Sequence, residues 1–118
     1  MANPTKVSSR LDKKVAVLEI SGDISDQSDE MILGAYRAVT SKGAKNILLK
    51  FHPEMFINSA GLRVLISLAL ECQKNKQPLR ATGLSSHMRK VFDIIGLTEH
   101  LGIHETEAAA IKAGKAVL

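Results

Sequence analysis

The residues best suited to carry chemistry in this sequence lie in one short stretch, residues 58–63. Ser59 offers a hydroxyl group, and Asn58 before it is a residue type that commonly caps the start of a helix. Free N–H groups and the helix dipole at such a start stabilise an added negative charge. A phosphate group on Ser59 would therefore be favoured locally, and Arg63, one helical turn further on, could pair with it. The alternatives are a serine that only caps the helix and a solvated surface arginine.

Other candidate chemistry in the sequence has weaker support. His100 and His104 are four residues apart, but Gly102 lies between them, so a metal-binding pair on one helix is not expected. Ser59 does not lie in a Gly-x-Ser-x-Gly elbow, and the glycines form no phosphate-binding loop. Cys72 is the single cysteine and is expected to be a buried structural residue. We therefore expect no enzyme, no cofactor and no metal site.

The segments on either side of Ser59 are expected to hold it in place. The short apolar run at 47–51 is typical of a buried strand. The segment 59–75 predicts a helix that is buried around most of its circumference, with a narrow polar stripe. The stripe consists of Arg63, Ser67 and Glu71.

The rest of the chain alternates between strand and helix patterns. Further strands are expected at 6–11, 15–20, 79–82 and 101–103, and further helices start near 25–30, 86 and 106. The apolar face of the first helix is predicted from Met31, Ile32, Ala35, Tyr36, Ala38 and Val39. This alternation predicts an α/β fold with one layer of sheet covered by helices, in one domain spanning 1–118 with residues 1–5 as a loose end.

Composition narrows the classes of function. Hydrophobic residues make up 45% of the 118 residues, which argues against disorder. The net charge of +4 comes from scattered basic residues without interleaved aromatics, so direct nucleic-acid binding is not expected. The N-terminus has no apolar signal region, and the longest apolar run, 64–70, is too short to cross a bilayer. We expect a cytoplasmic protein without membrane insertion.

Residues 56–66, Phe-Ile-Asn-Ser-Ala-Gly-Leu-Arg-Val-Leu-Ile, resemble the signature of the STAS domain, the fold of the anti-sigma factor antagonists. The usual form of that signature is Phe-[Ile/Met]-Asp-Ser-[Ser/Thr]-Gly-Leu-x-Val-Leu. Two further matches, Ser-Gly-Asp-Ile at 21–24 and Val-Phe-Asp-Ile-Ile-Gly-Leu at 91–97, extend the resemblance over roughly the whole chain. It implies a single-domain STAS-like fold with a mixed sheet of four to five strands covered by about four helices.

The resemblance also implies a binding module in a partner-switching pathway, with Ser59 at the position of the serine that is phosphorylated in the family. The unphosphorylated form binds an anti-sigma factor, usually a serine kinase of the histidine-kinase-like ATPase fold, and the sigma factor is released. Phosphorylation abolishes binding, and a serine phosphatase reverses it. The expected partner-binding residues lie where strands lead into helices. They are Ser25, Asp26, Asn58, Ser59, Ala60, Gly61, Arg63, Gly83, Ser85 and Ser86.

Three residues depart from the usual family pattern. Asn58 stands in place of Asp, Ala60 stands in place of Ser or Thr, and Ser25 occupies a position where an acidic residue is common. The acids of the family lie around the serine and help the kinase to dock. Because these acids are missing, an alternative function remains: the chain could be a constitutive scaffold or transport-complex subunit that is not regulated by phosphorylation. A small-molecule or nucleotide-binding domain is a third possibility, although no specific nucleotide motif is present.

Overall fold

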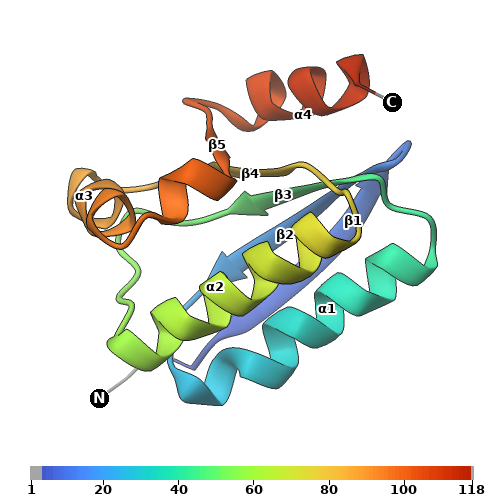
Figure 1. Cartoon of the computed structure of the whole chain (residues 1–118). Coiled ribbons are helices and arrows are strands. Elements are labelled where there is room, and N and C mark those ends of the chain that lie inside the picture. Colours follow the sequence, from blue (N-terminus) through green and yellow to red (C-terminus); the bar gives the residue numbers. More distant parts are fainter. Residues whose placement is uncertain (1–3, 118) are drawn as a thin grey trace.

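Five strands form one mixed sheet in residues 4–117, the part of the chain that this computed structural model describes (Figure 1). In the order of the sheet they are β1 (Lys6–Asp12), β2 (Val15–Ser21), β3 (Asn46–Lys50), β4 (Leu79–Thr82) and β5 (Gly102–Ile103). β1 is antiparallel to β2, and the other neighbours are parallel. The predicted α/β fold with four to five strands is confirmed.

Helices cover both faces of the sheet. They are α1 (Asp29–Ser41), α2 (Ser59–Lys74), α3 (Ser86–Ile94) and α4 (Glu107–Ala116), with 3-10 turns η1 (Asp26–Ser28) and η2 (Leu97–His100). In Figure 1, α1 and α2 run side by side across one face and α4 lies on the other. The predicted start of the first helix is divided: Ser25 accepts a hydrogen bond from the Gln27 N–H and caps η1, so α1 begins only at Asp29.

Alternate side chains of the central strands pack into two separate cores, as the period of a strand requires. The core under α1, α2 and α3 takes Ala16, Leu18 and Ile20 from β2 with Ile47 and Leu49 from β3. The smaller core under α4 joins Val17 and Leu48 to Ala110. Burial on both faces explains why β2 and β3 are almost continuously apolar in sequence.

The two longest helices are less buried than their sequences indicate. On α2, Ile66 is 37% exposed and Leu70 is 57% exposed, so the prediction of burial around most of the circumference is wrong. These two residues line an open cavity with Ile95 and His100, next to η2, so this side of α2 is only partly covered. On α1, Met31 and Ala38 are exposed and Leu33 is buried in their place.

Two local expectations concern Cys72 and the N-terminal end. Cys72 is 1% exposed, as predicted, and burial raises the pKa of its thiol to about 12, which leaves it protonated and unreactive. Residues 1–3 of the expected loose end lie outside the described residues. Thr5, however, is not loose, because its hydroxyl donates to the Asp23 carbonyl and lies 2.5 Å from the Ser28 hydroxyl.

Two ion-pair groups fasten α4 to the sheet. Glu107 lies 2.8 Å from Arg10 on β1 and 3.4 Å from Lys50 on β3, and Lys115 lies 2.8 Å from Asp12. Burial alone would raise the pKa of Glu107, but the hydrogen bond and charge of Arg10, together with the charge of Lys50, lower it overall. The carboxylate of Glu107 is therefore stabilised in its charged form by the folded state.

Replacing Glu107 by Gln should weaken the attachment of α4 and lower the free energy of unfolding by about 0.5–1 kcal/mol near neutral pH. Because the folded state lowers this pKa, the contribution is present above the ordinary glutamate value of 4.5 and is lost as the pH falls through the folded-state value. Urea unfolding should show a difference from wild type that closes in acid. Glu105→Gln, at an exposed neighbouring carboxylate, is the matched control. A difference that does not change with pH would contradict this account.

Candidate functional site

Ser59 is the first residue of α2 and is exposed to solvent. Asn58 before it has an extended backbone, and its side-chain oxygen accepts a hydrogen bond from the Gly61 N–H at 2.8 Å. The predicted N-cap is therefore confirmed. The Ser59 side chain makes no hydrogen bond within residues 4–117, so its hydroxyl is available at the positive end of a helix.

The start of α2 is held by the segment that follows β2. The Ile24 N–H donates to the Phe56 carbonyl at 2.8 Å, and the Asn58 N–H donates to the Ile24 carbonyl at 3.2 Å. These bonds frame a parallel bridge between Ile24 and Ile57. Gly61 then packs so closely that an added Cβ atom would lie 2.3 Å from the Ile24 carbonyl oxygen. A glycine is required here because a backbone atom occupies the place of a side chain.

A similar close approach shapes the loop between β4 and α3. Gly83 has a φ of +82°, and a Cβ atom there would lie 1.9 Å from the Phe51 carbonyl oxygen. Ser85 caps α3 by accepting a hydrogen bond from the Met88 N–H at 3.1 Å. Three connections, after β2, β3 and β4, therefore leave the sheet at the same edge, where parallel strands end.

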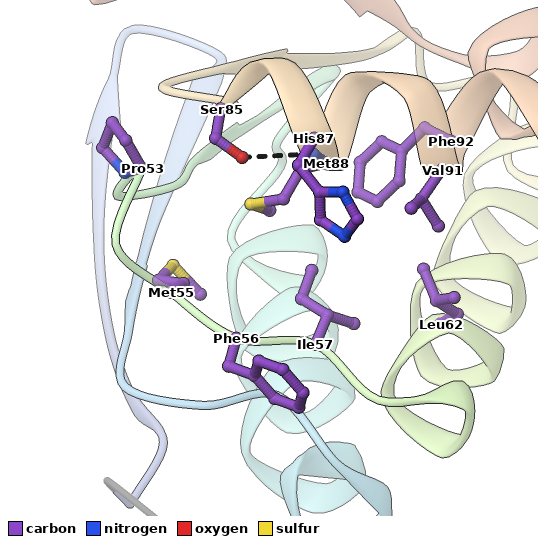
Figure 2. Close-up of a pocket in the computed structure, with 10 residues that line it drawn as sticks. All are labelled: Pro53, Met55, Phe56, Ile57, Leu62, Ser85, His87, Met88, Val91 and Phe92. Carbon is purple, nitrogen blue, oxygen red and sulfur yellow. Dashed lines mark hydrogen bonds between the residues drawn. The ribbon is translucent and has the colours of Figure 1, made fainter.

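Three of the ten predicted site residues line two cavities at this edge, and the other seven line neither. Ser25 and Asn58 line one cavity of about 400 Å³, together with Thr5 and Met31. Ser85 lines a second cavity of about 320 Å³, in which side chains of the β3–α2 loop and of α3 face one another (Figure 2). Its lining comprises Pro53, Met55, Phe56, Ile57, Leu62, Ser85, His87, Met88, Val91 and Phe92.

Phe56 joins the two cavities and was not among the predicted site residues. Its side chain lines both cavities and is 67% exposed, while Met31 beside the first cavity is 43% exposed. The signal in the sequence was an aromatic residue two positions before the helix cap, in a chain with few aromatics. A large exposed apolar side chain beside a polar edge is typical of a binding surface.

Exposed charged side chains lie on both sides of this edge of the sheet. Asp26, Asp29 and Glu30 are exposed around η1 and the start of α1. Arg63 is exposed on α2 and forms no ion pair with any residue between 4 and 117. The pairing of Arg63 with a phosphate on Ser59 stays a prediction.

No group of three or more His, Cys, Asp or Glu side chains within residues 4–117 is arranged to hold a metal ion. Within the same residues, none of the helices has the length and apolar character needed to cross a membrane.

A match to a model of a protein family identifies the family of the chain. The family model described as "Mlab, STAS domain" matches residues 7–104. The chain belongs to the STAS domain family. The resemblance inferred from residues 56–66 is confirmed.

Relatives of this STAS domain carry a consistent name. BtrV of Bordetella bronchiseptica, named as an anti-sigma factor antagonist, is 27% identical over 99 residues, which cover 84% of this chain and 85% of BtrV. An anti-sigma factor antagonist from Mycobacterium paratuberculosis matches with a TM-score of 0.74 at 18% identity, covering 95% of each chain. Phosphorylated SpoIIAA of Bacillus matches with a TM-score of 0.65 at 20% identity, covering 93% of this chain and 98% of SpoIIAA. At these identities the two structures show the fold alone.

Gly61→Ala should destabilise the STAS domain by about 1–3 kcal/mol, because the new methyl group collides with the Ile24 carbonyl. This loss outweighs the gain of about 1 kcal/mol that alanine brings to a helix. Gly34→Ala is the control, since no atom lies within 4 Å of an added Cβ on α1. Urea unfolding should show Gly34→Ala equal to wild type or slightly more stable. Equal effects of the two substitutions would refute the close-contact explanation.

Proposed function

We propose that this STAS domain is an anti-sigma factor antagonist whose binding to an anti-sigma factor is switched off by phosphorylation of Ser59. The observation that carries the proposal is the place of Ser59, an exposed hydroxyl at a capped helix start beside the exposed ring of Phe56. The name of BtrV and the existence of SpoIIAA in phosphorylated and unphosphorylated forms support it.

The direction of the switch follows from the charge that a phosphate adds. A phosphoserine carries about −1.5 to −2 charges at neutral pH. At the start of α2 this charge is favourable by about 0.3–1 kcal/mol, so the fold is retained. At an interface the same charge must lose its hydration or meet acidic groups of the partner, and each ~1.4 kcal/mol of that cost weakens binding tenfold. One modification can therefore remove binding and leave the domain folded.

The proposed docking surface has two parts around Phe56. One is the cavity that contains Ser25 and Asn58, and the other is the cavity that contains Ser85. A partner seated on both would cover the other proposed contact residues that reach the surface, which are Asp26, Ser59, Ala60, Arg63, Gly83 and Ser86. Gly61 is buried against Ile24 and would act by positioning the start of α2. The partner is proposed to be a serine kinase of the histidine-kinase-like ATPase fold, reset by a serine phosphatase, and the setting is the cytoplasm.

A constitutive scaffold or transport-complex subunit is the second candidate. It is favoured by what the departing residues do in the structure. The Ser25 hydroxyl caps η1, and the Asn58 side chain caps α2, so neither position offers the acidic group that is usual in the family. Ala60 also leaves Ser59 as the one hydroxyl in residues 58–61. In this alternative Ser59 has no regulatory role.

Ser59→Glu should weaken binding to the anti-sigma factor by at least about tenfold, whereas Ser59→Ala should bind as wild type. The partner is first recovered from host lysate with the wild-type domain and identified by mass, and its affinity is then measured by calorimetry with purified proteins. Ser67→Glu, which places the same charge on an exposed position of α2, is the control and should bind normally. Equal binding by Ser59→Ala and Ser59→Glu would reject the switch and favour the scaffold.

Phe56→Ala should weaken the same complex by about tenfold or more, because an exposed aromatic side chain between two cavities is suited to anchor a partner. The free energy of unfolding should change by less than about 0.5 kcal/mol, since the ring is 67% exposed. Leu70→Ala, at an exposed apolar residue far along α2, is the control for a general loss of apolar surface. Normal binding by Phe56→Ala would place the interface elsewhere.

A further inference from the structure

β1 is the outermost strand on one side of the sheet, and the long side of β1 away from β2 is open. β1 pairs only with β2, and no backbone group of Lys6–Asp12 bonds to another element within residues 4–117. Most of its side chains are exposed, including Leu11 at 37%. An edge strand of seven residues offers a row of unpaired N–H and C=O groups to another strand.

The side chains of β1 divide cleanly between the two faces of the sheet. Val7 packs against the main core under the helices, and Leu11, four residues on, shares that face. Arg10 and Asp12 point to the opposite face, where they contact Glu107 and Lys115 of α4. A strand added to this edge must present matching side chains on both faces.

The sequence of β1 is complementary to itself in one antiparallel register. When two copies are paired about Ser9, Lys6 lies opposite Asp12 and Val7 lies opposite Leu11. Opposite charges then face each other on the α4 side, and apolar residues face each other on the helix side. All seven residues of β1 are paired, and no like charges are opposed.

The neighbouring registers that keep the faces matched are unfavourable. Pairing about Ser8 places Lys6 opposite Arg10, and pairing about Arg10 places that residue opposite its own copy. Both oppose like charges, which is destabilising between directly paired positions. Each also pairs fewer residues within Lys6–Asp12. The charge pattern therefore selects the register about Ser9.

α1 is the helix that a second copy paired to β1 would meet on that face of the sheet. α1 packs over β1, and its Arg37 turns toward α2 to contact Glu71 at 2.7 Å. At about 100° per residue, Ala35 and Ala38 lie roughly 160° and 100° round the helix from Arg37. By the same spacing, Met31 and Lys42 lie about 120° and 140° round the helix, so the flank of α1 away from α2 carries two alanines and two flexible side chains. Two such helices would meet through these residues across the extended sheet.

We propose that two copies of this chain associate through β1 into a symmetric dimer with one continuous ten-stranded sheet, built from two five-stranded sheets. The occupant of the edge is a second copy because the charges and apolar residues of β1 match their own reversed order. This proposal does not depend on the proposed role of Ser59, which lies in another element.

The test is a charge exchange across the symmetric pair. Lys6→Glu opposes two acids and Asp12→Lys opposes two bases, so each should weaken dimerisation by about tenfold or more. The double variant Lys6→Glu/Asp12→Lys restores opposite charges and should recover the wild-type dissociation constant. Sedimentation velocity from micromolar to near-millimolar protein measures that constant. Lys112→Glu, on exposed α4 surface, is the control and should dimerise normally.

The possible results of this experiment either support or overturn pairing through β1. Loss of the dimer in both single variants with recovery in the double variant supports pairing about Ser9. A wild-type chain that stays monomeric throughout, a dimer that ignores the single variants, or a double variant that fails to recover would each overturn the proposal. Circular dichroism and urea unfolding confirm that the variants are folded, which matters for Asp12→Lys because it also removes the ion pair with Lys115. Failure here leaves the Ser59 binding test unaffected.

Discussion

The contact between the first turn of α2 and the Ile24 carbonyl is the constraint on which the candidate site depends. Gly61 permits the approach, and the two hydrogen bonds that flank Ile24 align the incoming chain. Ile57 pairs at the bridge and packs toward the core, so the neighbouring Phe56 is directed outward, as the alternation of an extended chain requires. The exposed ring and the exposed serine hydroxyl are thus consequences of one buried backbone contact.

The opposite end of α2 is fixed by a buried polar network. The Tyr36 hydroxyl donates to the Gln77 side-chain oxygen at 2.5 Å and accepts from the Asn75 amide at 2.7 Å. The Gln77 amide donates in turn to the Thr40 hydroxyl and the Ala44 carbonyl. Removing the Tyr36 hydroxyl would leave the side-chain oxygen of the buried Gln77 without this donor, at a cost of about 1–3 kcal/mol. With both ends held, α2 presents its N-terminus on a rigid frame rather than on a mobile loop.

Much of this arrangement could be predicted from local sequence. Asn58 before an apolar helix is a strong start signal, and apolar runs bounded by glycine or proline locate the strands, so these elements were placed correctly. Exposure on α2 could not be predicted, because Ile66 and Leu70 have the same residue types as buried neighbours and only the tertiary packing distinguishes them. The division into η1 and α1 depends on a reciprocal cap between Ser25 and Ser28, which the predicted helix start did not include.

For the site residues, too, the sequence predicts position in the fold better than exposure. Sequence reasoning predicts Ser25, Asn58 and Ser85 as polar site residues at strand ends. In the structure, each side chain accepts a backbone hydrogen bond and caps a helix. Phe56 carries more of the accessible apolar surface than any of them, and its importance appears only when the two cavities are seen on either side of its ring. Local patterns thus locate the edge of the sheet, and tertiary structure decides which side chains on it are exposed.

The residues that cap the helices determine how a charge at Ser59 would affect the fold. The side chains that cap α2 and α3 belong to Asn58 and Ser85, so the Ser59 hydroxyl supports no hydrogen bond whose loss would loosen the fold. A phosphate there meets the N–H groups of a helix start on one side and solvent on the other. Its effect on folding would therefore be small and favourable. The cap of α2 and the Ser59 hydroxyl belong to different residues, so a charge added at Ser59 would leave the cap intact.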